Sequence, residues 1–430
     1  MSTLKVNKLR DTARSTDAIT LDPNGGAVLA GVTTVSTVKV GSGVTISSDG
    51  DVFTTGITTS STVIVGSGVT ISESGIEASG IGITCANING TQIGGRRNLI
   101  INGAMLVAQR GTSSTSSGYN SVDRFPVNFT GTDEAVTQEQ ADVAAGTTPY
   151  SLGFRKCLKI TNGNQTSGAG ADDYIYTGQK FEAQNIANSG WNYVSASSFI
   201  TLTFWVKSSV AQNFYGYIRT HDTPKYLYPF ETGSLSADTW TKITKTISGN
   251  SNLVIDNDAN TGFELVISPF FGTNDTGSGA TLNQWGAWDS TERVPDYTTT
   301  WYTTNNATFE ITGVQLEVGS QATAFEHRSV GEELTLCQRY CQPYISYFEY
   351  TAGGTGNLGG PTVSFATPMR AAPSFTSDHE SKSSNWTFSS YNTALPNNDA
   401  RGYTYFQIVF DTSDSNYGYY RRYGLATSEL

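Results

Sequence analysis

Aromatic residues in polar loops are the side chains of this sequence whose types and spacing best suit ligand binding. Trp285 and Trp288 lie three residues apart in a stretch rich in Asn, Gly and Asp, and Trp301 and Tyr302 follow closely. An aromatic face can stack on the C–H groups of a sugar ring, and loops often carry binding residues. The spacing therefore predicts a glycan-binding site at these four residues. The alternative is that they cap a core or contact another subunit, because large aromatic side chains are mostly buried.

A second aromatic group lies near the C-terminal end of the sequence. Tyr417, Tyr419 and Tyr420 fall within four residues. Gly353-Gly354 and Gly359-Gly360 precede them and indicate turns between short strands. We expect these tyrosines to contact a receptor from a small β tip.

Residues for catalysis are few. The sequence has only three histidines, His221, His327 and His379, and no G-x-S-x-G motif, so a nucleophile lacks an obvious base. Paired carboxylates could hydrolyse a glycosidic bond. The candidates are Asp172-Asp173, Asp256 with Asp258, and Glu332-Glu333. Adjacent acidic residues of a strand point to opposite faces, so we expect no catalytic site and no enzyme.

Two motifs resemble parts of metal sites without completing one. Asp256-Asn-Asp-Ala-Asn260 begins like a calcium loop, but its sixth position is Thr261 and its twelfth is Ile267. This pattern favours an Asx-rich turn. Cys337 and Cys341 have no nearby histidine partners, which favours packed thiols over a zinc site. We expect no metal ion and no cofactor.

The composition of the 430 residues indicates a mostly β protein. Charged residues make up only 15% of the chain, whereas 45 glycines, 22 tyrosines and 20 phenylalanines suit turns and strands. The net charge of −11 and the lack of Lys/Arg clusters argue against nucleic-acid binding. No apolar run approaches the roughly 20 residues of a membrane span, and no secretion signal is evident. We therefore expect assembly in a cytoplasm and no membrane insertion.

An internal repeat precedes the aromatic-rich part of the chain. Val40–Ser47 recurs letter for letter as Val65–Ser72, an offset of 25 residues. Apolar and polar residues alternate within each copy, which predicts two or three short strands per repeat. Such strands cannot bury enough apolar surface alone. The repeat therefore favours a trimeric β shaft, with a disordered linker as the alternative.

The middle of the chain has the pattern of an antiparallel β-sandwich or jelly roll. Thr201–Lys207 and Ala307–Val318 alternate between apolar and polar residues, and other short strands are separated by turn-rich loops. In Ala307–Val318 the apolar residues change parity at Thr312-Gly313, which predicts a β-bulge.

One short helix is expected between the sandwich and the tip. Ser329-Val-Gly-Glu332 matches a capping box, and Leu334, Cys337 and Cys341 then share one helical face. Pro343 should end the helix. The alternation in Tyr403–Phe410 predicts a strand of the tip.

Several motifs occur together in an order that is similar to a sandwich domain of phage tail-fibre proteins. They are Arg97–Gly111, Ser121–Phe125, Phe204–Ser208, Ile311–Gly319, Ala324–Arg328 and Leu336–Tyr340. Ser2–Asn7 also resembles the start of virion appendage proteins of cyanobacterial phages. The resemblance implies a fold like that of carbohydrate-binding modules and recognition of a host glycan. The matching motifs, including His327, look like framework residues and identify no sugar site.

The sequence thus predicts a structural phage fibre or appendage subunit that forms a homotrimer. Residues 1–30 would dock to other virion proteins, 31–95 would form the shaft, 96–330 the sandwich, and 331–430 the linker helix and tip. The partner outside the virion would be host cell-surface polysaccharide. Two alternatives stay open: an architectural collar or capsid fibre without a ligand, and a polysaccharide depolymerase.

Overall fold

The computed structural model describes residues 97–430 apart from 352–355, 385, 394–402 and 414–416. Nearer the N-terminus it describes residues 8–9, 19–21, 27–29, 63–65, 69–72 and 75–78. The chain divides into two compact units, Met1–Thr84 and Cys85–Leu430, and each is described by itself. Strands predominate and helices are few, so the predicted mostly β fold is confirmed.

Short antiparallel strands make up the described residues of the first unit. One sheet contains β1 (Lys8–Leu9), β2 (Ile19–Leu21) and β3 (Ala27–Leu29), and another contains β4 (Val63–Val65), β5 (Val69–Ser72) and β6 (Gly75–Ala78). The last residue of β4 and all of β5 lie within the second copy of the repeat. These strands agree with the alternating pattern of the repeat. The first copy lies outside the described residues, and the trimeric shaft stays a prediction.

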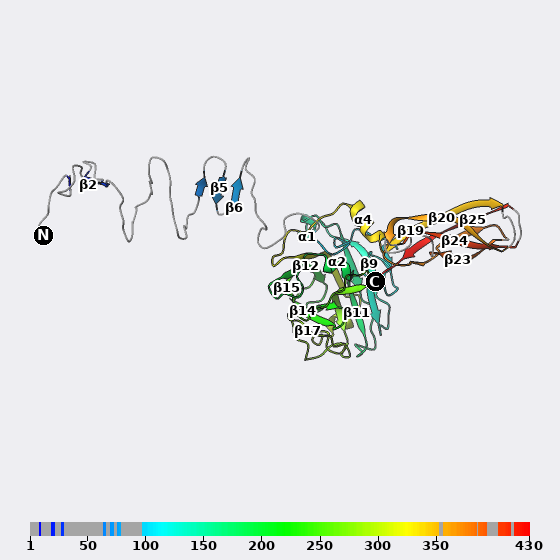
Figure 1. Cartoon of the computed structure of the whole chain (residues 1–430). Coiled ribbons are helices and arrows are strands. Elements are labelled where there is room, and N and C mark those ends of the chain that lie inside the picture. The colour runs from blue at the N-terminus through cyan, green and yellow to red at the C-terminus, as the bar shows by residue number, and fades with distance from the viewer. Residues whose placement is uncertain are drawn as a thin grey trace. The chain divides into compact units, whose positions relative to one another are not determined.

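Two six-stranded antiparallel sheets form a β-sandwich in the second unit (Figure 1). The first sheet has the order β15-β12-β18-β10-β9-β7, with β7 (Ser113–Ser114), β9 (Thr137–Asp142), β10 (Lys156–Thr161), β12 (Phe199–Ser208), β15 (Thr241–Ser248) and β18 (Thr308–Val318). The second sheet has the order β17-β14-β13-β16-β11-β8, with β8 (Val127–Thr130), β11 (Tyr174–Glu182), β13 (Asn213–Thr220), β14 (Tyr226–Ser234), β16 (Thr261–Phe271) and β17 (Gly286–Ala287). The main core consists of apolar side chains from both sheets, including Phe204, Phe214, Phe230 and Phe309.

The predicted β-bulge in β18 is confirmed. Thr203 of β12 pairs with Gln315, whereas Trp205 pairs with Thr312, so β18 contributes one extra residue at this point. Gly313 has a φ of +62°, a conformation that glycine adopts without steric cost. The extra residue keeps Ile311 and Val314 both in the core despite their odd spacing.

The linking helix begins where the capping box predicted. In α4 (Val330–Gln338) the hydroxyl of Ser329 accepts a hydrogen bond from the backbone N–H of Glu332, whose carboxylate accepts one from the N–H of Ser329 at 2.9 Å. The other helices, α1 (Thr148–Ser151), α2 (Ala183–Ala187) and α3 (Thr300–Thr303), are single turns.

The predicted end of the helix was wrong. Cys341 and Pro343 lie in strand β19 (Cys341–Thr351), so Cys341 does not share a helical face with Cys337. The strand pairs along its whole length with β25 (Tyr417–Thr427), and this long-range pairing overrides the local helical pattern. Proline is tolerated in β19 because the strand lies at the edge of its sheet.

The tip consists of two small antiparallel sheets with an aromatic core. One contains β19, β25, β21 (Ser374–Phe375) and β22 (His379–Lys382), and the other contains β20 (Gly356–Met369), β24 (Tyr403–Thr412) and β23 (Trp386–Asn392). The rings of Trp386 and Phe410 stack with their centroids 4.5 Å apart. The strand predicted at Tyr403–Phe410 is confirmed as β24.

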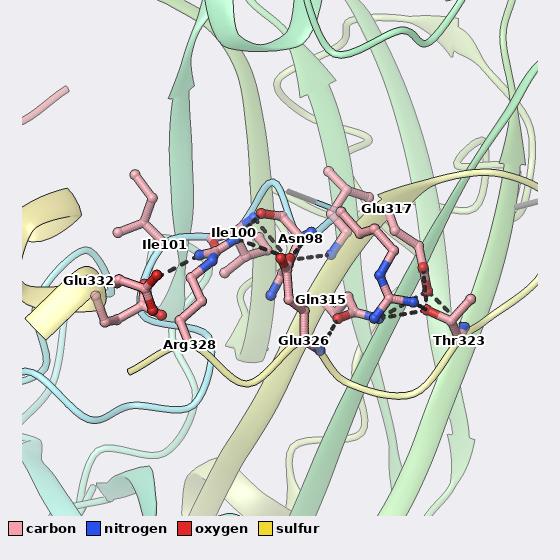
Figure 2. A network of polar contacts seen from close by, with 12 residues as sticks. Asn98, Ile100, Ile101, Gln315, Glu317, Thr323, Glu326, Arg328 and Glu332 are labelled. Carbon is pink, nitrogen blue, oxygen red and sulfur yellow. Dashed lines mark hydrogen bonds and ion pairs between the residues drawn. The ribbon is translucent and has the colours of Figure 1, made fainter. Parts of the chain in front are cut away.

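A polar network ties the start of the sandwich to the segment before α4 (Figure 2). The backbone N–H of Asn98 donates to the carboxylate of Glu326 at 2.6 Å. The guanidinium of Arg328 donates to the backbone carbonyls of Asn98 and Ile100. The backbone N–H of Glu326 donates to the side-chain oxygen of Gln315 at 2.8 Å. These contacts give Ala324–Arg328 a framework role.

Candidate functional site

The outer face of the second sheet carries a row of charged side chains. On adjacent strands Lys180 of β11 pairs with Glu264 of β16, and Glu264 pairs with Arg219 of β13. Successive side chains of a strand point to opposite faces of the sheet. The neighbouring residues Phe181 and Phe263 lie in the core, so the charged row lies on the face turned away from it.

The next row along the same strands is flat. Gly178 pairs with Val266, which in turn pairs with Tyr217. A Cβ atom on Gly178 would lie only 1.9 Å from the carbonyl oxygen of Leu265, so a side chain here would force β11 and β16 apart. Glycine in a strand interior often marks a place where a ligand approaches the backbone closely.

Aromatic side chains border this flat row. The ring centroids of Tyr174 and Tyr176 lie 5.4 Å apart, and those of Tyr176 and Phe271 lie 5.6 Å apart. The ring of Trp288 lies 6.1 Å from that of Tyr217. These rings form a cluster separate from the main core, and Tyr174, Tyr176 and Trp288 are partly exposed. Their accessible surfaces can stack on sugar rings.

Arg219 connects the charged row with Trp288. Its Cζ atom lies 3.6 Å from the centroid of a Trp288 ring, which is a cation–π contact. Its Nε atom is buried and has no hydrogen-bond partner within the described part of the chain. The contact with Trp288, and not a hydrogen bond of Nε, therefore fixes the position of this guanidinium.

A pocket with a volume of about 170 Å³ opens on this face. Its lining includes Gly178 and Val266 of the flat row together with Tyr176, Lys180 and Glu264. The other lining residues are Tyr119, Pro126, Asn128, Gln179, Leu265 and Leu430. The opening thus combines apolar surface with a few convergent polar groups, as ligand sites commonly do.

Glu264 is an ionised acceptor at this site. Burial alone would raise the pKa of its carboxyl group. The hydrogen bond with His221, whose Nε2 lies 3.0 Å from the carboxylate, and the charges of His221, Lys180 and Arg219 outweigh burial and hold the pKa of Glu264 below its ordinary value. The side chain is only 9% exposed, so its carboxylate is held in a fixed position.

The tyrosine hydroxyls of this face are protonated donors at neutral pH. Burial, together with the charge of Glu264, raises the pKa of Tyr176 to about 12. The same two causes raise the pKa of Tyr217 well above its ordinary value. The face therefore offers hydroxyl, ammonium and guanidinium donors beside one carboxylate acceptor.

The four aromatic residues predicted as a glycan site lie in different places. Trp288 lies on the outer face of the second sheet. Trp285 packs against the main core, and its Nε1 donates to the carbonyl of Ser248 at 2.8 Å. Trp301 and Tyr302 of α3 are fully buried between the sheets. A fully buried ring cannot contact a glycan, so we assign Trp301 and Tyr302 to the core and leave them out of the candidate site.

The sequence pattern alone did not point to Tyr176, Tyr217, Lys180 or Glu264. A signal exists, because Tyr-x-Tyr occurs at positions 174–176 and again at 215–217, in strands whose intervening residues are buried. Tyrosines at alternate positions of a half-buried strand face outward together. The pattern does not say that the two strands share one sheet with β16 between them.

The tip residues predicted to contact a receptor divide between two faces of one sheet. Tyr417 is 63% exposed and Tyr419 is 38% exposed, whereas Tyr420 is fully buried. Tyr347 on the neighbouring strand β19 is 55% exposed, and the carboxylate of Glu349 accepts hydrogen bonds from the hydroxyls of Tyr347 and Tyr417. Tyr420 thus belongs to the tip core and is unable to touch a receptor, while Tyr417 and Tyr419 stay candidates.

The other predicted features concern metals, thiols and membranes. The side chain of Asp258 accepts a hydrogen bond from the backbone N–H of Asn260 at 2.9 Å, which is the predicted Asx turn. Within the described residues, no group of three or more His, Cys, Asp and Glu side chains is placed to hold a metal ion.

Cys157, Cys337 and Cys341 are buried thiols, and burial raises the pKa of each. No helix in the described ranges has the length and apolar character needed to cross a membrane.

Comparisons with known proteins give matches only among solved structures, since no family model and no curated protein matches the chain. The N-terminal cellulose-binding domain of Cellulomonas fimi β-1,4-glucanase C matches with 10% identity and a TM-score of 0.24, covering 50% of this chain and 99% of that one. The CBM22-1 xylan-binding domain from Paenibacillus barcinonensis matches with 9% identity and a TM-score of 0.23, covering 50% and 96%. The family 11 carbohydrate-binding module from Clostridium thermocellum, in complex with a β-1,3-1,4-mixed-linked tetrasaccharide, matches with 10% identity and a TM-score of 0.23, covering 50% and 98%.

Proposed function

We propose that this protein binds a polysaccharide without cleaving it, through the outer face of the second sheet. The observation that carries the proposal is the arrangement on adjacent strands: the partly exposed rings of Tyr176 and Trp288, the flat base at Gly178, and the charged row with Glu264 and Arg219. Rings that stack on sugar C–H groups, next to fixed donors and an acceptor for sugar hydroxyls, meet the needs of glycan recognition.

The form of the pocket favours a chain over a small molecule. Its volume of about 170 Å³ is below the roughly 300–1,000 Å³ of pockets that enclose drug-sized ligands. Partly exposed aromatic rings lie beyond it on the same face, at Tyr174 and Trp288. A polysaccharide can therefore place one sugar unit in the pocket while its neighbours lie across the rings.

Affinity electrophoresis of the full chain in gels that contain neutral or acidic soluble polysaccharides tests this function. We expect at least one of them to retard the protein, and Arg219→Ala to reduce the retardation. Leu152→Ala is the control, because Leu152 is 51% exposed and does not line the pocket. A protein that no polysaccharide retards contradicts the proposal. Steady release of reducing ends from the polysaccharide would instead favour a depolymerase.

We further propose that this binding attaches a phage particle to its host, with the protein as a homotrimeric fibre or appendage subunit of the virion. The 25-residue repeat and the motifs at Arg97–Gly111 and Ile311–Gly319 support this role. Three linked copies would multiply a weak single-site affinity. Light scattering should give about three times the 46.0 kDa chain mass, and a monodisperse monomer contradicts the trimer.

A further inference from the structure

The residues that follow β25 return from the tip to the sandwich. The backbone N–H of Ser428 donates to the carbonyl of Tyr340 at 2.7 Å, and its hydroxyl donates to the carbonyl of Arg339 at 3.2 Å. Arg339 and Tyr340 are themselves fixed by Glu182 of the second sheet, through contacts of 2.6 to 2.7 Å. Figure 1 shows the C end of the chain beside the strands of the sandwich. We name Ser428–Leu430 the return segment.

Arg370, directly after β20, holds the backbone of the return segment. Its Nε donates to the carbonyl of Ser428 at 2.8 Å, and its Nη2 donates to the carbonyl of Glu429 at 2.9 Å. Its Nη1 donates to the carbonyl of Ala259, which precedes β16, at 2.9 Å. One planar guanidinium therefore joins the return segment to a loop of the sandwich, a geometry that lysine cannot reproduce.

The carboxylate of Glu429 lies between two arginines of the sandwich. It is 2.9 Å from Nη2 of Arg110 and also forms an ion pair with Arg124, whose side chain is only 1% exposed. Arg124 in turn donates to the carbonyl of Lys180 at 2.7 Å. Removing the partner of a buried charge is strongly destabilising, so this ion pair fixes the position of Glu429. The same arginine links it directly to the charged row.

The next residue, Leu430, lines the pocket of the candidate site. It does so together with Tyr119, Tyr176 and Glu264. Cζ of Arg110, which holds Glu429, lies 5.5 Å from the ring centroid of Tyr119. The contacts that fix Glu429 therefore also position two of the lining residues, Leu430 and Tyr119.

We infer that Leu430 is a specificity-determining residue of the glycan site, and that the return segment lets the tip set the size of the sugar unit that the pocket accepts. This inference rests on the proposed function of the pocket. The sandwich strands supply the hydrogen-bonding groups, whereas Leu430 adds an apolar wall from a segment that has passed through the tip. A smaller side chain at position 430 enlarges the pocket, so a sugar unit that carries a branch gains room.

Two substitutions in the full chain test this inference. Leu430→Ala removes the wall and leaves the ion pairs of Glu429 in place, and Glu429→Gln weakens the docking itself. Affinities are measured for an unbranched mixed-linkage glucan and for branched xyloglucan. We expect Leu430→Ala to change the ratio of the two affinities in favour of the branched polymer by roughly tenfold or more, since one methylene in an apolar pocket is worth about tenfold or more. Leu152→Ala is the matched control and should keep the wild-type ratio within roughly twofold.

Hydrogen exchange supplies a readout that needs no glycan. In Glu429→Gln, peptides covering β8 and β11 should exchange faster than in the wild type, because the buried Arg124 has lost its charged partner. If the wild type binds and Leu430→Ala has the same affinity ratio as the wild type, the inference is overturned and the proposed function still stands. Unchanged exchange in Glu429→Gln overturns the docking on which the inference depends. Exchange can be faster in Glu429→Gln although the wild type binds neither polymer nor any other polysaccharide. In that case the docking of the return segment holds, but the proposed function fails, and the specificity role of Leu430 fails with it.

Discussion

Replacing Trp285 and Trp288 separately by alanine should separate folding from binding. The two residues flank β17, a two-residue strand that pairs with β14, and an odd spacing in a strand places side chains on opposite faces of a sheet. Trp285 accordingly packs against the main core, whereas Trp288 lies in the outer aromatic cluster. Each variant removes one indole ring, so each is the control for the other.

The magnitudes follow from what each ring contacts. Trp285→Ala removes a 2.8 Å hydrogen bond to Ser248, which is worth about 1 kcal/mol. Truncating a fully buried tryptophan costs roughly 3–5 kcal/mol, and the partly buried Trp285 should lose only part of that amount. We expect it to lower the free energy of unfolding by about 2–3 kcal/mol. Trp288→Ala removes the contact with Arg219, worth about 0.5–1 kcal/mol, so stability should fall by about 0.5–1 kcal/mol. Its glycan affinity should fall at least tenfold, about 1.4 kcal/mol, as for an aromatic anchor at a binding site.

Urea unfolding followed by circular dichroism measures the stability of both variants without depending on tryptophan fluorescence. Calorimetric titration with the polysaccharide that retards the wild type measures affinity. Equal losses of affinity in two folded variants, or wild-type affinity in Trp288→Ala, would refute the assignment of the binding face.

Three further predictions concern the fold and its charges. Gly313→Ala should lower the unfolding free energy by about 2–4 kcal/mol in urea titrations, because φ is +62° and the new Cβ would lie 2.6 Å from the Phe154 ring; a loss below about 0.5 kcal/mol contradicts this. The folded-state pKa of Glu264 is lowered from 4.5, so its ionised form adds stability above that pH and loses it as the pH falls through the folded pKa. The melting temperature of the wild type should thus drop more steeply than that of Glu264→Gln as the pH falls below 4.5, and parallel profiles would refute the role of the charge. Tyr420→Ala should cost about 3–5 kcal/mol and Tyr417→Ala less than about 0.5 kcal/mol in thermal unfolding, and similar losses would show that the two faces are misassigned.

Strands and their irregularities were predictable where the pattern was local. The alternation in Ala307–Val318 predicted β18, and the change of parity at Thr312-Gly313 predicted its bulge. Both follow from the sequence because successive side chains of a strand point to opposite faces of the sheet. The capping box at Ser329 predicted where α4 begins. Its end was not predictable in this way, because Cys341 joins a strand whose partner β25 comes much later in the chain.

The candidate site could be predicted only in part, because strand order decides it. Composition drew attention to Trp285 and Trp288 equally, and only the pairing of β17 with β14 separates them. Lys180, Arg219 and Glu264 come from three distant segments that become neighbours when β11, β16 and β13 pair. The sequence states which side chains face outward on each strand, but not which strands lie next to one another.

The path of the chain makes the tip an insertion in the sandwich as well as an extension of it. The chain leaves the sandwich at Tyr340 and returns at Ser428, where the 2.7 Å hydrogen bond between these residues closes the loop. Because both ends of an inserted domain are anchored, it has less freedom to rotate than a domain on a single linker. Glu429 then neutralises Arg124, a charge that the sandwich strands bury. The tip is therefore held to the sandwich at two points, and Arg370 and Glu429 fix the second point directly beside Leu430, which lines the pocket.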